Sequence, residues 1–135
     1  MSAIIAPKGS PLNTAIIGVE NLDQSIGFYR DLIGLSVSDP FDWRGKDFED
    51  IWHLPSGSHA TGSFCELKGC NAGRVLLLDF KAENKKLIRP KDTSRAYGLF
   101  NLNFYTDDIE SDTKKFESKG YRIWSKPTYY EMSEG

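Results

Sequence analysis

The sequence contains little cysteine, little histidine and no long apolar run. Of its 135 residues, two are cysteines and two are histidines. Cys65 and Cys70 are too few for a disulfide scaffold, and their C-x4-C spacing without a second cysteine pair argues against a zinc site. No apolar run approaches the roughly 20 residues that span a bilayer, and the N-terminal segment is too weakly apolar for a secretory signal. We therefore expect a cytoplasmic protein with free thiols and no membrane partner.

An excess of positive charge is also absent. The formal net charge is −2 and the isoelectric point is about 5.7. Without a basic excess the chain has little charge with which to neutralise phosphates, so nucleic acid is not an expected partner. The chain does have 39% hydrophobic and 13% aromatic residues, which at this length is enough for one folded domain.

The most regular stretch is Leu12–Leu35, which predicts a strand, a capped helix and a stop signal. Thr14–Val19 is β-branched and apolar, as strands usually are. Asn21 is a good helix cap, and Gln24 three residues later is suited to complete a capping box. Apolar residues then recur along one helix face, and Gly34 follows at a position where a left-handed conformation costs little.

A second copy of this pattern occupies Gly98–Tyr121. Leu99–Thr106 predicts a strand, Asp108 offers a helix cap, and Gly120 repeats the stop signal. Arg122–Trp124 is then expected to begin a new strand. The helix of the second copy is expected to be one residue shorter than that of the first, because its stop signal comes one residue earlier after the cap.

Between the two copies, Ser38–Gly57 is punctuated by proline and glycine and is expected to be irregular. It is rich in aromatic residues, including Trp43 and Trp52. Such a segment either packs over a pocket or closes the edge of the core, and the sequence leaves both interpretations open.

Two strands joined by a turn are expected next, at His59–Lys68 and Gly73–Lys81. The second strand is apolar at alternate positions on both sides, so both of its faces are expected to be covered. Asp79 is the exception. A carboxylate at the end of such a strand requires a partner, a metal or a water-filled cavity.

The expected organisation is a single domain of residues 1–135 built from two related modules. Module one covers about residues 12–82 in the order β-α-β-loop-β-β, a polar connector covers residues 83–96, and residues 97–135 form a partial module two in the order β-α-β. The repeat predicts two further strands that this sequence lacks. We expect that module two is truncated; the alternative is that another chain supplies those strands.

The helix signatures of both modules match those of a known family. Val19–Asp23 and Ser25–Leu35 carry a strand end, an Asn cap and the run FYRDLIGL at the family spacing, and Thr106–Ile109, Phe116 and Gly120–Tyr121 follow the same pattern in module two. On these residues the chain resembles the vicinal oxygen chelate superfamily, which includes glyoxalase I, bleomycin-resistance proteins and extradiol dioxygenases.

The resemblance implies an α+β fold in which paired βαβββ modules form an open, incomplete barrel around a cavity, with helices outside. Alternation along the first strand would then turn Thr14 and every second residue after it towards the cavity. Asn101, Asn103 and Tyr105 of module two would face the cavity from the opposite side.

Metal-dependent members of this family hold their ion with four ligands, usually His, Glu or Gln. The first-strand positions are taken here by Thr14 and Asn101, Asp79 lies at or near the third position, and the fourth would lie beyond Gly135. A neutral hydroxyl and an amide are weak donors, and one carboxylate does not hold a catalytic Fe, Ni or Zn ion. We therefore expect no metal cofactor.

The leading interpretation is a metal-free protein of the bleomycin-resistance type that binds a small, partly aromatic or cationic molecule. No catalytic residue is assigned. The residues expected to contact the ligand supply flat apolar surface or orienting polar groups: Thr14, Trp43, Trp52, Asp79, Asn101, Asn103 and Tyr105.

Two other hypotheses remain open. One is a metal-dependent lyase, isomerase or ring-cleaving dioxygenase, in which Asp79 and ligands from missing strands or a second chain hold Fe, Mn, Ni or Zn. The other is an interaction role, because an incomplete module leaves an open sheet edge that favours a homodimer.

Overall fold

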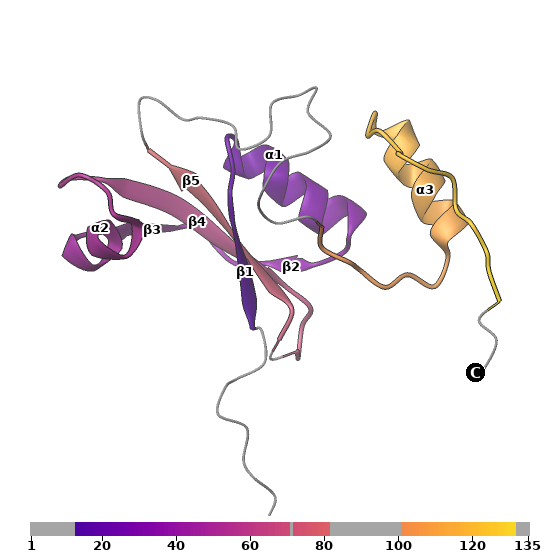
Figure 1. The fold of residues 1–135 in the computed structure, drawn as a ribbon, viewed down its shortest axis with the longest axis horizontal. Helices are drawn as coiled ribbons and strands as arrows, with labels where there is room; N and C mark the ends of the chain where they lie inside the picture. The colour runs from indigo at the N-terminus through magenta and orange to yellow at the C-terminus, as the bar shows by residue number, and fades with distance from the viewer. Residues whose placement is uncertain (1–12, 71, 82–100, 132–135) are drawn as a thin grey trace, which may run out of the picture. The chain divides into compact units, whose positions relative to one another are not determined.

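The computed structural model describes residues 13–70, 72–81 and 101–131 (Figure 1). The chain divides into two compact units, residues 1–96 and residues 97–135. The first unit contains β1 (Thr14–Gly18), α1 (Leu22–Gly27), the π-helical turn η1 (Phe28–Leu32), β2 (Ser36–Val37), β3 (Phe41–Arg44), α2 (Lys46–Trp52), β4 (His59–Glu66) and β5 (Arg74–Phe80). The second contains α3 (Ile109–Ser118).

The first unit is built on a curled, unclosed sheet of five strands, which confirms the predicted α+β class (Figure 1). The strand order is β1-β5-β4-β2, and β3 also pairs with β4. β1 runs parallel to β5, whereas β4 is antiparallel to β2, β3 and β5. The predicted hairpin of β4 and β5 is therefore confirmed, and the first and last of the described strands, β1 and β5, are neighbours.

One side of the sheet, which we call the helix face, is covered by α1. Strand alternation places Ala15, Val75, Leu77 and Cys65 on this side, and α1 contacts β4 and β5. Val75, Leu77 and Cys65 are fully or almost fully buried beneath the helix, so α1 closes this face over β4 and β5.

The other side, which we call the aromatic face, carries Thr14, Arg74, Leu76, Leu78 and Phe80. The register pairs Thr14 with Arg74 in the parallel strands β1 and β5, so their side chains leave the sheet on the same side. At the far end of this face, α2 closes a cluster in which buried Phe48 packs with Leu76 and Leu78. The face therefore has a polar end at Thr14 and an aromatic end at α2.

Both predicted helix caps are present. The Oδ1 atom of Asn21 accepts a hydrogen bond of 2.9 Å from the Gln24 N–H at the start of α1. The Oδ1 atom of Asp108 accepts one of 2.9 Å from the Ser111 N–H at the start of α3. Each bond satisfies a backbone donor that has no partner within the helix.

The helix ends also repeat, with one difference that explains their lengths. Gly34 and Gly120 both take positive φ angles, 84° and 81°, as predicted for left-handed stop residues. The Tyr121 N–H donates to the carbonyl of Phe116, five residues back, at 3.1 Å. In the first helix the chain winds through η1, and a π-helical turn holds one more residue than an α-helical one. The extra residue of the first copy therefore lies in η1.

The prediction that Ser38–Gly57 is irregular is wrong. β3 and α2 both lie within it, and β3 exists because its backbone pairs with β4. Gly45, with a φ of 101°, makes the turn between them. Proline and glycine correctly marked the ends of these elements, but the pairing that orders them comes from a strand further along the chain.

Two strand predictions in the second unit are also wrong. Residues 101–106 and 121–124 form no strand, while residues 99 and 100 lie outside the described part of the chain. A strand needs a partner for its backbone groups, and the described residues of this unit contain no other strand. The expected connector, residues 83–96, also lies outside the described residues. No helix in the part of the chain that the structure describes is long and apolar enough to cross a membrane.

Candidate functional site

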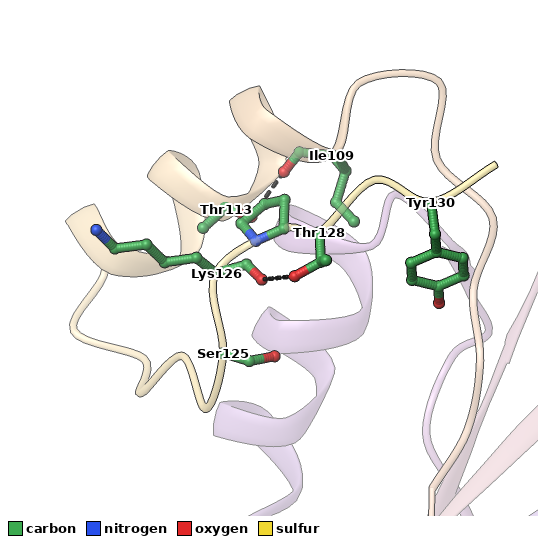
Figure 2. A pocket seen from close by; sticks show the side chains of 7 residues that line it. Ile109, Thr113, Ser125, Lys126, Thr128 and Tyr130 are labelled. Carbon is green, nitrogen blue, oxygen red and sulfur yellow. Dashed lines mark hydrogen bonds between the residues drawn. The ribbon is translucent and has the colours of Figure 1, made fainter.

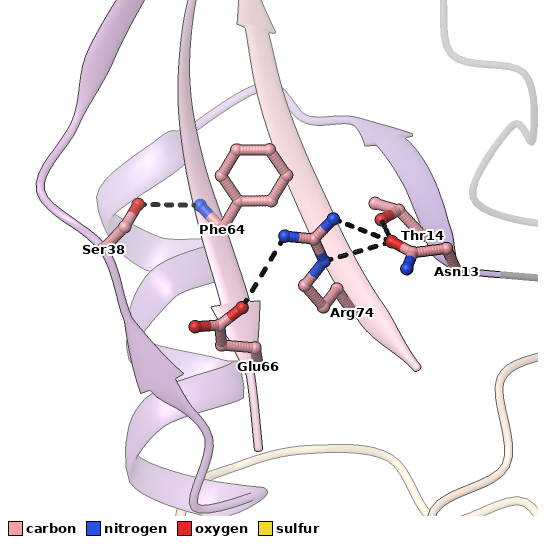
Figure 3. A network of polar contacts seen from close by, with 6 residues as sticks. All are labelled: Asn13, Thr14, Ser38, Phe64, Glu66 and Arg74. Carbon is pink, nitrogen blue, oxygen red and sulfur yellow. Dashed lines mark hydrogen bonds and ion pairs between the residues drawn. The ribbon is translucent and has the colours of Figure 1, made fainter. Parts of the chain in front are cut away.

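The polar end of the aromatic face is organised around the Arg74 guanidinium (Figure 3). Its Nε and Nη2 atoms donate to Asn13 Oδ1 at 3.2 and 2.7 Å. Thr14 Oγ1 donates to the same oxygen at 2.7 Å. Asn13 thus joins β1 to β5, and it brings Arg74 and Thr14 to one point.

Two further residues of β4 border the guanidinium. The Arg74 Cζ atom lies 5.1 Å from the centroid of the Phe64 ring, within the range of a cation–π contact. The Arg74 Nη1 atom lies 3.9 Å from Glu66 Oε2, an ion-pair distance too long for a hydrogen bond. Ser38 Oγ accepts from the Phe64 N–H at 3.0 Å and ties β4 to the segment that follows β2 (Figure 3).

Arg74 and Asn13 were not predicted as site residues. An arginine at the start of the apolar strand RVLLLDF is a detectable signal, because the other positions of that strand are mostly apolar. Its significance depends on the parallel pairing of β1 with β5, which places it opposite Thr14. The family resemblance alone did not supply the pairing of β1 with β5, and without that pairing Arg74 could not be placed beside Thr14.

The predicted ligand-binding tryptophans lie at the other end of the same face, packed into the aromatic cluster. Trp43 and Trp52 meet edge to face, with ring centroids 6.3 Å apart. Trp43 also packs against Phe48 at 5.3 Å, and Trp52 against Phe80 at 5.2 Å. Both indoles are half-buried, so the packing favours the second of the two interpretations, closure of the core edge. Their contact with a ligand stays a prediction.

Asp79 lies on the helix face, which corrects the expectation that it shares a cavity with Thr14. Thr14 is paired with Arg74, and Asp79 is an odd number of residues further along β5, so it points to the opposite side of the sheet. The side chain is largely buried and forms an ion pair with Lys81. Without knowing how β5 pairs with β1, the sequence could not tell which face of the sheet Asp79 occupies.

The remaining predicted residues belong to the second unit and are exposed. Asn101 Nδ2 donates to Asn103 Oδ1 at 3.2 Å, and the Tyr105 side chain is fully exposed. The two asparagines therefore satisfy each other in part. Their contact with a ligand stays a prediction.

An open hollow of about 480 Å³ lies beside α3 in the second unit (Figure 2). Hydroxyl groups dominate its lining, but Thr113 Oγ1 donates to the Ile109 carbonyl at 2.6 Å and Thr128 Oγ1 to the Lys126 carbonyl at 3.3 Å. These hydroxyl protons are thus committed to the backbone. The hollow gathers no pair of acid and base groups, so we do not take it as the functional site.

Within the first unit, the residues with clearly shifted pKa values lie away from the aromatic face. Burial raises the pKa of the Cys65 thiol to about 11, and burial followed by the nearby Cys65 raises the pKa of Tyr29. On β3, the hydrogen bond from Arg44 lowers the pKa of Asp42. Cys65 and Asp42 project to the helix face, and Tyr29 belongs to η1.

The residues at the polar end do not fit a metal of the kind that metal-dependent members of the resembled family hold. Thr14 offers only a hydroxyl, which donates its hydrogen to Asn13, and the cationic guanidinium of Arg74 binds the same oxygen. A divalent cation placed beside Thr14 would be repelled by that charge. Among the described residues, no three His, Cys, Asp or Glu side chains gather where they would hold an ion.

Comparisons with known proteins concern the fold and the family of the chain. A glyoxalase family protein from Bacillus cereus is 19% identical, with 97% of this chain and 85% of that chain covered and a TM-score of 0.78. The protein SMU.1112c is 18% identical, with 85% and 78% covered and a TM-score of 0.56. At such identities the likeness concerns the fold alone. No curated protein matches the chain. The family model of the Glyoxalase/Bleomycin resistance protein/Dioxygenase superfamily matches residues 12–135, and the chain therefore belongs to that superfamily.

Proposed function

We propose that the protein binds a small, partly aromatic molecule on the aromatic face of its sheet without a family-type metal. The observation that carries this proposal is the position of Arg74, whose guanidinium lies beside Thr14 at the polar end of that face. A fixed positive charge at this point supplies what a metal ion would supply to an electron-rich ligand group, and it needs no ligand set.

The same face provides apolar surface beside the charge. Ile16 is two residues along β1 from Thr14, shares its side of the sheet, and is 45% exposed. A flat apolar ligand resting on Ile16 would lie within reach of the guanidinium. A few polar groups beside exposed apolar surface are typical of small-molecule sites.

Neither the cationic ligand nor the metal-dependent enzyme that the sequence left open gains support from this geometry. A cationic group at the polar end would meet the guanidinium at close range, and like charges repel most strongly where water is partly excluded. Glu66 offsets part of the charge, but its 3.9 Å separation from Arg74 makes it a weak partner. We therefore retain only the metal-free binding protein.

Ligand binding and metal content test this proposal together. The full chain, purified without chelator, would be analysed for metals and titrated with small aromatic compounds by ligand-observed NMR. Ile16→Thr, which removes apolar surface and keeps a β-branched residue, should weaken binding. Leu67→Thr alters another exposed apolar residue, just beyond β4, and should leave binding unchanged. Stoichiometric Fe, Mn, Ni or Zn, or equal effects of the two substitutions, would overturn the proposal.

A homodimer and a cytoplasmic location are further parts of the proposal. The support for a dimer is the open sheet, in which β1 pairs with β5 alone among the described strands. A strand edge of this kind favours pairing with a second chain. Light scattering at micromolar concentration should give the mass of two chains, and the mass of one chain would count against it.

A further inference from the structure

Resting on the proposed function, we infer that the ligand carries a carboxylate and that Arg74 receives it, with Glu66 as the group that the carboxylate displaces. The inference therefore names the chemical class of the ligand: a small aromatic acid. It depends on three features of Arg74, namely its unused donors, its fixed position and its weak partner.

Arg74 has hydrogen-bond donors without an acceptor among the described residues. A guanidinium carries five N–H bonds in a planar fork. Among the described residues, Asn13 Oδ1 takes one hydrogen bond from Nε and one from Nη2, and Glu66 stays beyond hydrogen-bond distance of Nη1. Three N–H donors thus lack an acceptor in the part of the chain that the structure describes, and two adjacent ones on Nη1 and Nη2 match the spacing of a carboxylate.

The guanidinium is also held in place before any ligand arrives. Two hydrogen bonds to Asn13 fix one edge of its plane, and the Phe64 ring lies near its centre. Its side chain is 35% exposed, so Arg74 is partly shielded and still accessible to a ligand from solvent. A partly shielded, pre-positioned charge binds an anion more strongly than a mobile surface arginine does.

Glu66 is the natural competitor for the open edge. Its side chain is 44% exposed, and its carboxylate forms no hydrogen bond and no ion pair other than the 3.9 Å one with Arg74 among the described residues. An incoming carboxylate that forms two direct hydrogen bonds would replace this loose pairing. The same glutamate repels the incoming anion, so its removal should strengthen binding.

Three probes of the same shape and different charge test the inference: benzoate, benzamide and benzamidine. Each would be titrated into the full chain at low ionic strength, with binding measured by ligand-observed NMR and calorimetry. Benzoate should bind most tightly, by about tenfold or more over benzamide, and benzamidine least. If benzamide binds as tightly as benzoate, the inference is overturned while the proposed function stands. If benzamidine binds best, the position of Arg74 supports neither the inference nor the proposed function. If none binds, the proposed function loses its support as well.

Variants then assign the effect to Arg74. Arg74→Met should weaken benzoate binding by about tenfold or more and leave benzamide binding nearly unchanged, whereas Glu66→Gln should strengthen benzoate binding several-fold. Arg44→Met is the matched control, because Arg44 is also paired with a carboxylate, Asp42, but projects to the helix face.

Fold loss is checked separately, by far-UV circular dichroism and by an Arg74→Lys variant. Lysine keeps the charge and loses the two-pronged geometry, so it should bind benzoate with intermediate affinity. Equal benzoate affinity in wild type, Arg74→Met and Arg74→Lys would overturn the inference, as would weaker rather than stronger binding by Glu66→Gln.

Discussion

Thr14 and Arg74 are register partners in neighbouring parallel strands, and both donate hydrogen bonds to Asn13 Oδ1. The pairing brings together the beginning of β1 and the beginning of β5. At the position where a metal-dependent relative would place a ligand, this chain therefore places a hydroxyl beside a fixed positive charge. On the proposed function, the same fold would carry a different chemistry in this chain, which is common among folds that serve many functions.

Gly62 supports the aromatic face by having no side chain. A Cβ atom at this position would lie 2.7 Å from Leu78 Cδ2, 3.0 Å from Phe41 Cζ and 3.2 Å from the Leu77 carbonyl oxygen. Because the carbonyl is backbone and cannot rotate away, Gly62→Ala should destabilise the protein by about 1–3 kcal/mol. Urea denaturation would measure the change.

Gly27→Ala is the control for that experiment. Gly27 is the last residue of α1, and a Cβ there would meet nothing closer than Asp31 Oδ2 at 3.7 Å. Because alanine favours a helix, this substitution should stabilise the protein by a few tenths to about 1 kcal/mol. A loss of stability at Gly27 equal to that at Gly62 would contradict the packing argument.

Trp52 combines a packed ring with a polar atom that lacks a partner. Its Nε1 atom is buried and has no hydrogen-bond acceptor among the described residues. Trp52→Phe removes that unsatisfied donor and keeps an aromatic ring beside Phe80, so it should change stability by less than about 1.5 kcal/mol. Trp52→Ala should lower the free energy of unfolding by about 3 kcal/mol or more, because it leaves a cavity in the cluster.

The two Trp52 variants also separate core from ligand-binding roles. If the ring is chiefly a core residue, Trp52→Phe should leave the benzoate affinity within about twofold of wild type, as measured by the titration described above. A large loss of affinity with little loss of stability would instead assign Trp52 to the ligand site.

The cap of α1 is the third point at which a single atom can be tested. Asn21→Ala removes the oxygen that accepts from the Gln24 N–H and should lower the free energy of unfolding by about 1 kcal/mol. Asn21→Asp keeps an acceptor and adds favourable charge at the helix start, so it should retain or slightly raise stability. Thermal denaturation of the three proteins gives the order, and an equal loss in both variants would show that the cap bond contributes nothing.

The parts of the fold that the sequence predicted are those determined by local chemistry. Asn21, Asp108, Gly34 and Gly120 act through hydrogen bonds and backbone angles within a few residues, and each has the predicted role. β3 was missed because its backbone is paired by β4, a strand further along the chain.

The candidate site was harder to predict because it depends on strand register. Asp79 was placed in the cavity and Arg74 was overlooked. Both errors arose because the sequence does not show which strand β5 pairs with. Once β1 is known to pair with β5, alternation moves Asp79 to the helix face and brings Arg74 beside Thr14. A one-residue uncertainty along a strand exchanges the two faces, so residue types alone do not identify the site.

Cys65 should make the protein less stable as the pH becomes alkaline. Burial raises the pKa of its thiol from 9.0 to about 11 in the folded protein. Between these values the unfolded chain releases the thiol proton while the folded chain keeps it, so the free energy of unfolding falls as the pH rises from about 9 to about 11. The raised pKa of Tyr29, caused mainly by burial, acts in the same direction above its ordinary value of 10.0.

The expected loss of stability from the thiol is on the order of 2 kcal/mol across that range, measured by urea denaturation at half-unit steps of pH. Cys65→Ala should lower stability at neutral pH by removing buried volume and should reduce the loss of stability between pH 9 and 11, leaving above pH 10 the part that Tyr29 causes. Tyr29→Phe should flatten only the part above pH 10. In the folded wild type, exposed Cys70 should react with iodoacetamide well before Cys65 at pH 8, because Cys65 is buried and its thiol stays protonated. Equal alkylation rates at the two cysteines, or a pH dependence that Cys65→Ala leaves unchanged, would contradict this assignment.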